Sequence, residues 1–156
     1  MRRKDREITN PDAIDQILKG CDCCRLGIAA EGAPYVVPLN FGYRREGGVP
    51  TFYFHCAKEG RKLELLRRQP RVGFELDTRH QLKEGATACR YSFGYQSVIG
   101  VGTVAFVTDE REKREALECI LRQYTGRTGW QWEEAALGSV TVLRLHAEEL
   151  TCKAHA

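Results

Sequence analysis

Apolar and polar residues alternate over several short runs of this chain, which is the period of a strand with one buried face. Such runs cover residues 24–30, 34–43, 50–56, 71–77, 95–108 and 139–146. Glu31-Gly32-Ala33 separates the first two runs and predicts a hairpin with a short glycine loop. We expect the first three runs to form a meander, because the links between them are too short for parallel crossovers.

Helical spacing of apolar residues occurs in three other segments. The first predicted helix follows Asn10, a candidate N-cap, and ends at Gly20. The second is predicted over residues 58–68. The third begins at Thr108 or Asp109, where acidic residues fill the first turn and the helix dipole favours them.

The remaining segments show neither period. Residues 78–88 are polar and contain a glycine, which predicts a loop. The end of the chain, with His146, Cys152 and His155, predicts a frayed tail rather than a metal cluster. The charged residues 1–8 predict a flexible N-terminal arm.

Six strands in sequence order, with helices between and beside them, do not make parallel βαβ units. We therefore predict an α+β domain whose sheet is mostly antiparallel. A closed or split barrel is the most economical way to remove sheet edges, and we predict a six-stranded split β-barrel with flanking helices. The chain has 156 residues and no internal repeat or linker, so a single domain over residues 1–156 is expected.

Composition narrows the classes of function. Hydrophobic residues make up 42% of the chain and charged residues 29%, which is typical of a globular domain. The net charge of +3 suits a small anionic ligand and is too mild for a nucleic-acid partner. No apolar run approaches the ~20 residues of a membrane helix. The charged start also lacks the apolar stretch of a signal peptide, so we expect a cytoplasmic protein.

The seven cysteines are an odd number without a secretion signal, which indicates reduced thiols. Cys21 and Cys24 have the C-x-x-C spacing of redox pairs and of half a zinc site. A second pair is absent from the sequence, and an apolar strand run follows at once. Cys23 and Cys24 therefore fit small buried residues that enter this strand, and no metal site is expected.

The stretch most informative about chemistry covers residues 52–63, where a strand ends, the chain turns and a helix begins near Gly60. Backbone N–H groups at a helix N-terminus bind phosphate, and a glycine lets the backbone approach closely. Arg61 and Lys62 would add charge-assisted hydrogen bonds, although basic residues are also common on exposed helix faces. His55 fits an exposed strand end, a satisfied core histidine or a proton donor beside a ligand.

Two further stretches could meet a planar ligand. Pro38 gives no N–H to a ladder, so its strand should be an edge or be bulged. The backbone at Leu39 and Asn40 would then be free to contact a ring, although a hairpin strand could also simply tolerate the proline. Residues 91–98 mix aromatic rings, hydroxyls and an amide, which suit either a ligand or the core.

Together these segments resemble the pyridoxamine 5′-phosphate oxidase-like split barrels that bind FMN. More narrowly, they resemble the Nim-type branch, named for nitroimidazole-resistance reductases. The segments that carry the resemblance cover residues 2–7, 32–41, 52–57, 59–62, 69–74 and 95–100. Their order and spacing form a much stronger signal than any one of them, whereas residues 85–94 have no clear counterpart.

The resemblance implies a homodimer with two FMN molecules in clefts between the subunits. The cofactor-binding residues that it implies are Pro38, Leu39, Asn40, Phe41, His55, Ala57, Gly60, Arg61, Lys62, Ser97 and Val98. The strand around Pro38 would line the isoalloxazine ring, and Arg61 and Lys62 would meet the phosphate with Ser97 nearby. His55 matches the histidine that lies close to the flavin and the substrate in the Nim branch, so it is the candidate catalytic residue.

The activity that follows from the resemblance is an FMN-dependent oxidoreductase. It would take electrons from a donor such as NAD(P)H and reduce a small electrophile, for example a nitroaromatic compound. A non-catalytic flavin- or haem-binding protein of the same fold is an alternative, and the deazaflavin F420 could replace FMN. A pyridoxamine 5′-phosphate oxidase fits less well, because the chain is short and lacks a second basic cluster for the substrate phosphate.

Overall fold

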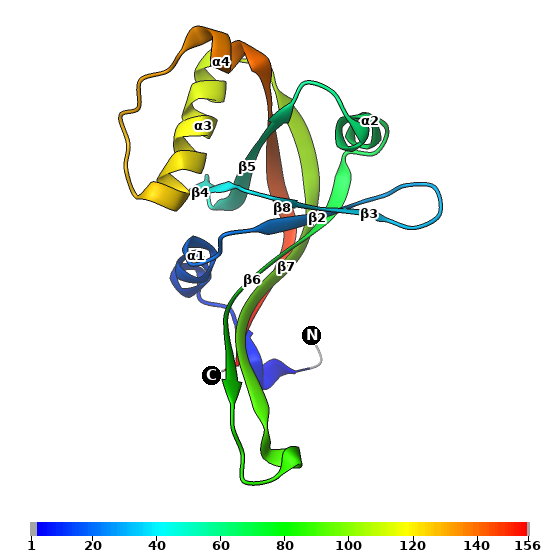
Figure 1. The fold of residues 1–156 in the computed structure, drawn as a ribbon, viewed down its shortest axis with the longest axis vertical. Helices are drawn as coiled ribbons and strands as arrows, with labels where there is room; N and C mark the ends of the chain where they lie inside the picture. Colours follow the sequence, from blue (N-terminus) through cyan, green and yellow to red (C-terminus); the bar gives the residue numbers. More distant parts are fainter. Residues whose placement is uncertain (1–2, 156) are drawn as a thin grey trace.

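The computed structural model describes residues 3–155, which form one antiparallel sheet with helices at its sides (Figure 1). The strands are β1 (Glu7–Ile8), β2 (Cys24–Ile28), β3 (Tyr35–Leu39), β4 (Gly42–Glu46), β5 (Val49–Ala57), β6 (Arg71–Lys83), β7 (Ser92–Val107) and β8 (Val140–His155). The helices are α1 (Pro11–Lys19), α2 (Arg61–Arg68), α3 (Glu110–Thr125) and α4 (Glu134–Ser139), with 3-10 turns η1 (Lys4–Arg6) and η2 (Ala88–Arg90). The predicted α+β class is confirmed, with eight strands in the described residues in place of six.

The order of the strands in the sheet is β3-β2-β6-β7-β8-β5-β4, and β1 pairs with β8. β3 and β4 therefore lie at opposite edges, yet only Asn40 and Phe41 join them. Three Cα–Cα steps span at most about 11 Å, so the sheet must curl until its two edges nearly meet. The edges do not pair, which makes the barrel split rather than closed.

The prediction of one strand over residues 34–43 is wrong, and so is the predicted meander. The run divides in two: β3 pairs with β2, whereas β4 pairs with β5 at the other edge. The edge position predicted from Pro38 is confirmed, because β3 ends the sheet on its side. A proline that cannot donate to a further strand is tolerated there.

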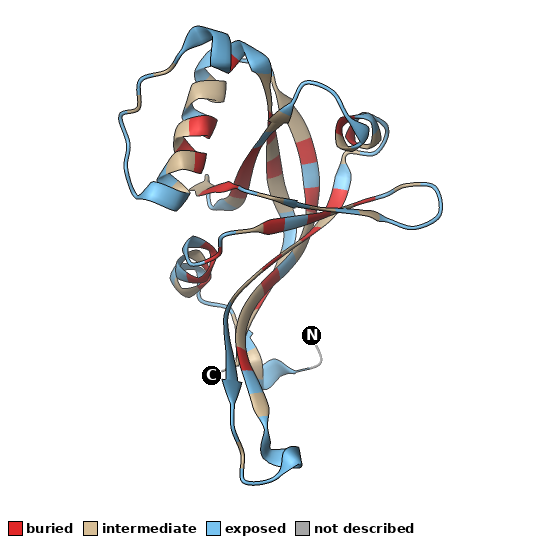
Figure 2. Ribbon diagram, viewed as in Figure 1, coloured by how far each residue is buried: buried red, intermediate tan, exposed pale blue. Residues whose placement is uncertain are grey.

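The core fills the inside of the curled sheet, where buried positions follow the middle of the strands (Figure 2). The ring of Phe52 packs against three other aromatic rings, with centroids 5.1–6.0 Å apart, and these belong to Phe41, Tyr43 and Phe74. α1 and α2 add apolar residues to this core. α3 covers the outside of the barrel instead, where Tyr53 and Val142 are buried against it. Burial of such rings supplies much of the driving force for folding.

The predicted N-termini of two helices are confirmed. The Asn10 side chain accepts a hydrogen bond from the backbone N–H of Ala13 at 3.0 Å and caps α1. Asp109 caps α3 in the same way, with 2.7 Å to the N–H of Glu112. These caps satisfy backbone donors that a helix leaves free at its start.

The predicted loop at residues 78–88 is wrong up to Lys83, and the predicted tail after residue 146 is wrong. β6 runs on to Lys83 through a bulge between Thr78 and Gln81, and β8 continues to His155. Together with β7 they form a long three-stranded extension that projects from the barrel (Figure 1). The polar end of β6 is held by ladder hydrogen bonds to β7, a long-range effect that local composition does not reveal.

The N-terminal segment predicted as an arm is partly ordered against the sheet. Glu7 and Ile8 pair with Lys153 and Cys152 of β8. Residues 1 and 2 of the predicted arm lie outside the described residues. Within residues 3–155 no helix has the length and apolar character needed to cross a membrane.

Candidate functional site

The turn between β5 and α2 has a backbone shape that favours glycine. Gly60 has φ +133° and ψ 164°, a combination that side chains make unfavourable. A Cβ placed on Gly60 would meet no atom within 4 Å, so the turn is open on that side. The chain therefore enters α2 sharply and leaves its first turn accessible.

The first turn of α2 presents backbone donors. The carbonyl oxygen of Gly60 accepts hydrogen bonds from the N–H groups of Leu63 and Glu64, at 2.9 and 3.2 Å. No side chain caps the helix, so within the described residues the N–H groups of Arg61 and Lys62 lack an acceptor. Free N–H groups at the positive end of the helix dipole form an anion site.

Side chains from three elements surround this turn. They enclose a shallow depression of about 210 Å³ that is lined by Tyr35, Cys56, Ala57, Glu59, Gly60, Arg61, Lys62 and Leu63. The guanidinium of Arg61 lies over the ring of Tyr35, 5.0 Å from its centroid. Burial raises the pKa of the Cys56 thiol, while the nearby ammonium of Lys62 acts to lower it. Lys62 thus holds a positive charge at the floor of the depression.

The structure brings four of the predicted site residues together here, namely Ala57, Gly60, Arg61 and Lys62. It adds Tyr35, Cys56, Glu59 and Leu63, which are not among the predicted site residues. Tyr35 heads the predicted ring-binding stretch, and its place at the start of β3 is the signal that could have found it. A phosphate monoester fits these groups, since two cations and two N–H donors at the open turn outweigh the single carboxylate of Glu59.

Two other predicted residues share the outer face of the sheet. Pro38 is opposite Arg25, Arg25 opposite Glu75, and Glu75 opposite Ile99. Side chains of paired residues point to the same face, so Pro38 and Ile99 lie on one surface. Ser97 is two residues before Ile99 on β7 and is on this face too. Neither Pro38 nor Ser97 lines the depression at α2.

Three predicted residues face the core instead, because the side chains of Phe41 and Val98 are fully buried in it and Leu39 packs against it. Only the backbone of Phe41 and Val98 could meet a ligand. The N–H of Phe41 donates to the hydroxyl of Tyr124 at 3.0 Å. Leu39 packs half-buried against the core, whereas Asn40 beside it is exposed.

His55 is exposed on the outer face of β5, opposite Val142. Ala57 lies two residues further along the same strand and is also exposed, so both point to one face. His55 does not line the depression, but it precedes it directly along the chain. Of the three readings weighed for His55, burial as a core histidine is excluded.

Comparison with known proteins settles the family. The family profile described as pyridoxamine 5′-phosphate oxidase matches residues 10–154. The chain belongs to this family. Among curated proteins none matches the chain.

Several solved structures share this fold. One is a protein from Bacteroides thetaiotaomicron VPI-5482 that is assigned provisionally to 5-nitroimidazole antibiotic resistance. It is 35% identical with a TM-score of 0.81, and the match covers 95% of this chain and 86% of that one. The flavocytochrome Anf3 from Azotobacter vinelandii has a TM-score of 0.80 at 20% identity, covering 100% of this chain and 72% of its own. An FAD and haem binding protein from Mycobacterium smegmatis has a TM-score of 0.77 at 16% identity. The match covers 96% of this chain and 73% of that one.

Proposed function

We propose that this member of the family binds FMN and works as a flavin-dependent reductase of a small electrophile. The observation that carries the proposal is the open first turn of α2, with its free N–H groups beside Arg61 and Lys62. This turn suits the dianionic phosphate of FMN. The exposed face around Pro38, with the backbone of Asn40 at the sheet edge, would hold the planar ring.

FMN, when bound, would supply the hydride and electron transfer, with NAD(P)H as the electron donor. The chain's own residues bind and orient it. Arg61 would keep its position over Tyr35 and Lys62 its position beside Cys56, so both cations are pre-organised for the phosphate. His55 would anchor the substrate or donate a proton from the same outer face.

The substrate class is proposed from the 35% identical structure, whose description names resistance to 5-nitroimidazoles. A nitroaromatic compound is a small planar electrophile of the kind that an open face beside a flavin accommodates. Two other related structures are described as a flavocytochrome and as an FAD and haem binding protein. Haem, FAD and F420 are therefore the competing cofactors in the test below.

We also propose that two copies of the chain assemble with the cofactor between them. Several large apolar side chains are exposed on β3, β6 and β7, namely Val36, Leu82, Phe93 and Ile99, each at 51–60% exposure. Exposed apolar residues gathered on neighbouring strands favour burial by a partner. A second copy would also explain how Ser97, which does not line the α2 depression of its own chain, could serve a cofactor.

Cofactor identity is tested by the visible absorption spectrum of the purified protein, before and after incubation with FMN and desalting. Retained flavin bands are expected. Lys62→Ala should raise the Kd of FMN roughly tenfold to hundredfold, the loss of one charge-assisted hydrogen bond. Lys58→Ala is the matched control, because Lys58 is exposed in the preceding loop and does not line the depression. A Soret band, or no retention of FMN, would overturn the flavin assignment.

The assembly is tested by light scattering behind size exclusion. Wild type is expected at twice the chain mass, and Ile99→Asp should shift it toward the monomer. Ala136→Asp on α4 is the control, because this residue is exposed and is not one of the apolar residues proposed as the contact, so the dimer should stay intact. A monomeric wild type at micromolar concentration would contradict the homodimer.

A further inference from the structure

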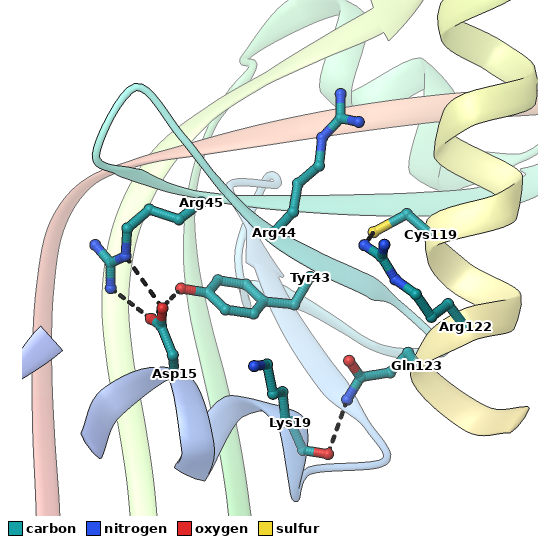
Figure 3. A pocket seen from close by; sticks show the side chains of 8 residues that line it. All are labelled: Asp15, Lys19, Tyr43, Arg44, Arg45, Cys119, Arg122 and Gln123. Carbon is teal, nitrogen blue, oxygen red and sulfur yellow. Dashed lines mark hydrogen bonds and ion pairs between the residues drawn. The ribbon is translucent and has the colours of Figure 1, made fainter. Parts of the chain in front are cut away.

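A larger cavity lies on the side of the barrel away from α2, between α1, β4 and α3 (Figures 1 and 3). Its volume is about 560 Å³, within the range of small-molecule sites. Its walls come from Asp15 and Lys19 on α1, Tyr43, Arg44 and Arg45 on β4, and Cys119, Arg122 and Gln123 on α3. The proposed flavin chemistry gives this cavity no role.

The walls of the cavity are held firmly in place. The Gln123 side-chain amide donates to the carbonyl oxygens of Leu18, Lys19 and Cys21, at 3.2, 3.3 and 3.0 Å, and so fixes the end of α1 to α3. β4 lies tight against α3, since a Cβ on Gly42 would come within 2.5 Å of the Ile120 nitrogen. A pocket built from such contacts exists before any ligand arrives.

Positive charge exceeds negative charge along these walls. Four cationic side chains face one carboxylate, that of Asp15. Arg45 is paired with it, with Nη2 2.5 Å from Oδ1. Arg44 is turned toward Glu46 and Tyr53, at 2.5 and 2.8 Å.

Two cations remain available. Within residues 3–155 neither Lys19 nor Arg122 forms an ion pair. The only side-chain hydrogen bond of Arg122 among these residues is 3.9 Å to the sulfur of Cys119, a weak acceptor. Figure 3 shows Lys19 reaching up from α1 and Arg122 reaching across from α3 toward the space beside Tyr43. The Tyr43 hydroxyl donates to the Asp15 carboxylate at 2.6 Å, so this carboxylate is already bonded to both Arg45 and Tyr43.

We propose that this pocket binds a small organic anion through Lys19 and Arg122. The planar guanidinium of Arg122 can hold a carboxylate or phosphate group with two hydrogen bonds, and Lys19 adds a point charge. The volume leaves room for a carbon skeleton beyond a bare ion. The ligand class is therefore a phosphorylated or polycarboxylate metabolite. The proposal does not depend on the flavin site, because the two lie on different elements.

Calorimetric titration at low ionic strength tests the proposal, with pyrophosphate and citrate as separate probes that distinguish phosphate from carboxylate recognition. The probes are titrated into Lys62→Ala, in which the proposed phosphate site at α2 is weakened, and this protein should bind at least one probe with one site per chain, since Lys62 belongs to the other side of the barrel. Added to Lys62→Ala, the substitutions Lys19→Ala and Arg122→Ala should each weaken binding about tenfold, the loss of one charge-assisted contact. Lys4→Ala and Arg90→Ala remove the same charges at exposed positions outside the pocket and should leave binding unchanged.

The variants at Lys19 and Arg122 are expected to fold normally because both side chains are exposed, and their thermal unfolding curves check this. Retained binding in both variants, or binding abolished by Lys62→Ala, would overturn the proposal by placing the probe elsewhere. Failure of wild type to bind either probe at millimolar concentration would overturn it too. None of these results depends on whether FMN is retained.

Discussion

The hydroxyl of Tyr124 on α3 accepts a hydrogen bond from the backbone N–H of Phe41 at 3.0 Å. The same hydroxyl donates to the carbonyl oxygen of Asp22 at 2.8 Å. Phe41 belongs to the two-residue link that carries the chain from one sheet edge to the other. A helix far along the chain therefore satisfies the backbone at the point where the barrel is split, next to the strand proposed to hold the flavin ring.

Tyr124→Phe removes both hydrogen bonds and keeps the ring that packs against Phe41. We expect the free energy of unfolding to fall by about 1–2 kcal/mol, because the N–H of Phe41 loses its acceptor. Urea unfolding measures this. Tyr91→Phe is the control, since Tyr91 is 50% exposed on the hairpin and should change stability by less than about 0.5 kcal/mol. Equal stabilities of the two variants would contradict the role of Tyr124.

Gly60→Ala should destabilise the protein by about 1–3 kcal/mol through the backbone alone, because φ is +133° and the new Cβ would meet nothing. The affinity for FMN should fall with it. Gly138→Ala on α4 also places a Cβ in open space, but at an ordinary φ, and should stabilise by about 0.5–1 kcal/mol as helix propensity predicts. Thermal unfolding of both variants shows whether Gly60→Ala destabilises the protein and Gly138→Ala stabilises it. A neutral Gly60→Ala would show that the turn relaxes freely.

Much of this fold follows from local sequence. Asn10 and Asp109 mark the starts of α1 and α3, because a side chain that caps a helix does so through its nearest neighbours. Local sequence also predicts the turn between β5 and α2, because Gly60, Arg61 and Lys62 are consecutive there. The edge position of β3 also follows from one residue, Pro38.

What local sequence cannot predict depends on partners far along the chain. The strand residues up to Lys83 are mostly exposed, and they are ordered by pairing with β7 rather than by an apolar face of their own. The end of β8 looks like a tail in sequence, yet Tyr95 pairs with His155. Likewise, nothing near Arg122 in sequence indicates that Lys19 lies across a shared cavity.

Asp15→Asn tests the ion pair beside that cavity. Burial acts to raise the pKa of Asp15, but hydrogen bonds from Arg45 and Tyr43 hold it below its usual range. Because the pKa of Asp15 is lower in the folded state, its ionised carboxylate stabilises the protein fully at pH values above the unfolded-state pKa of about 3.9. This stabilisation is lost as the pH falls through the folded-state pKa. Wild type should therefore exceed Asp15→Asn by about 1–3 kcal/mol at pH 7 and by much less near pH 3. Urea unfolding at both pH values measures the difference.

Asp22→Asn is the control for this pH dependence, because Asp22 is exposed and its side chain forms no ion pair within the described part of the chain. Its stability should match wild type at both pH values within about 0.5 kcal/mol. If the free energies of unfolding of Asp15→Asn and wild type differ by the same amount at both pH values, the charge of Asp15 contributes nothing to stability.

His55→Ala separates binding from chemistry. The side chain is exposed and does not line the α2 depression, so the Kd of FMN should change little. If His55 donates a proton during reduction of a nitroaromatic probe, kcat should fall roughly 10²- to 10⁴-fold. His80→Ala on the projecting hairpin is the control and should keep full turnover. Unchanged turnover and unchanged FMN binding in His55→Ala would remove His55 from the site.

The thiol of Cys56 can report on Lys62, because the ammonium beside it lowers a pKa that burial raises. Lys62→Met removes this charge, so the pKa of Cys56 should rise further and alkylation by iodoacetamide at pH 8.5 should slow several-fold. Peptide mapping by mass spectrometry follows each cysteine separately. Cys89, exposed on η2, should react at the same rate in both proteins.

Bound FMN should slow alkylation of Cys56 in wild type, because a phosphate that pairs with Lys62 withdraws its charge from the thiol and covers the depression. In Lys62→Met the same concentration of FMN should have little effect on the alkylation rate of Cys56. The alkylation rate of Cys89 should be the same in both proteins, with and without FMN. If FMN is retained by wild type yet leaves the Cys56 rate unchanged, the phosphate does not lie at the first turn of α2. The reactivity of one half-buried thiol thus tests the position of the phosphate without any assay of turnover.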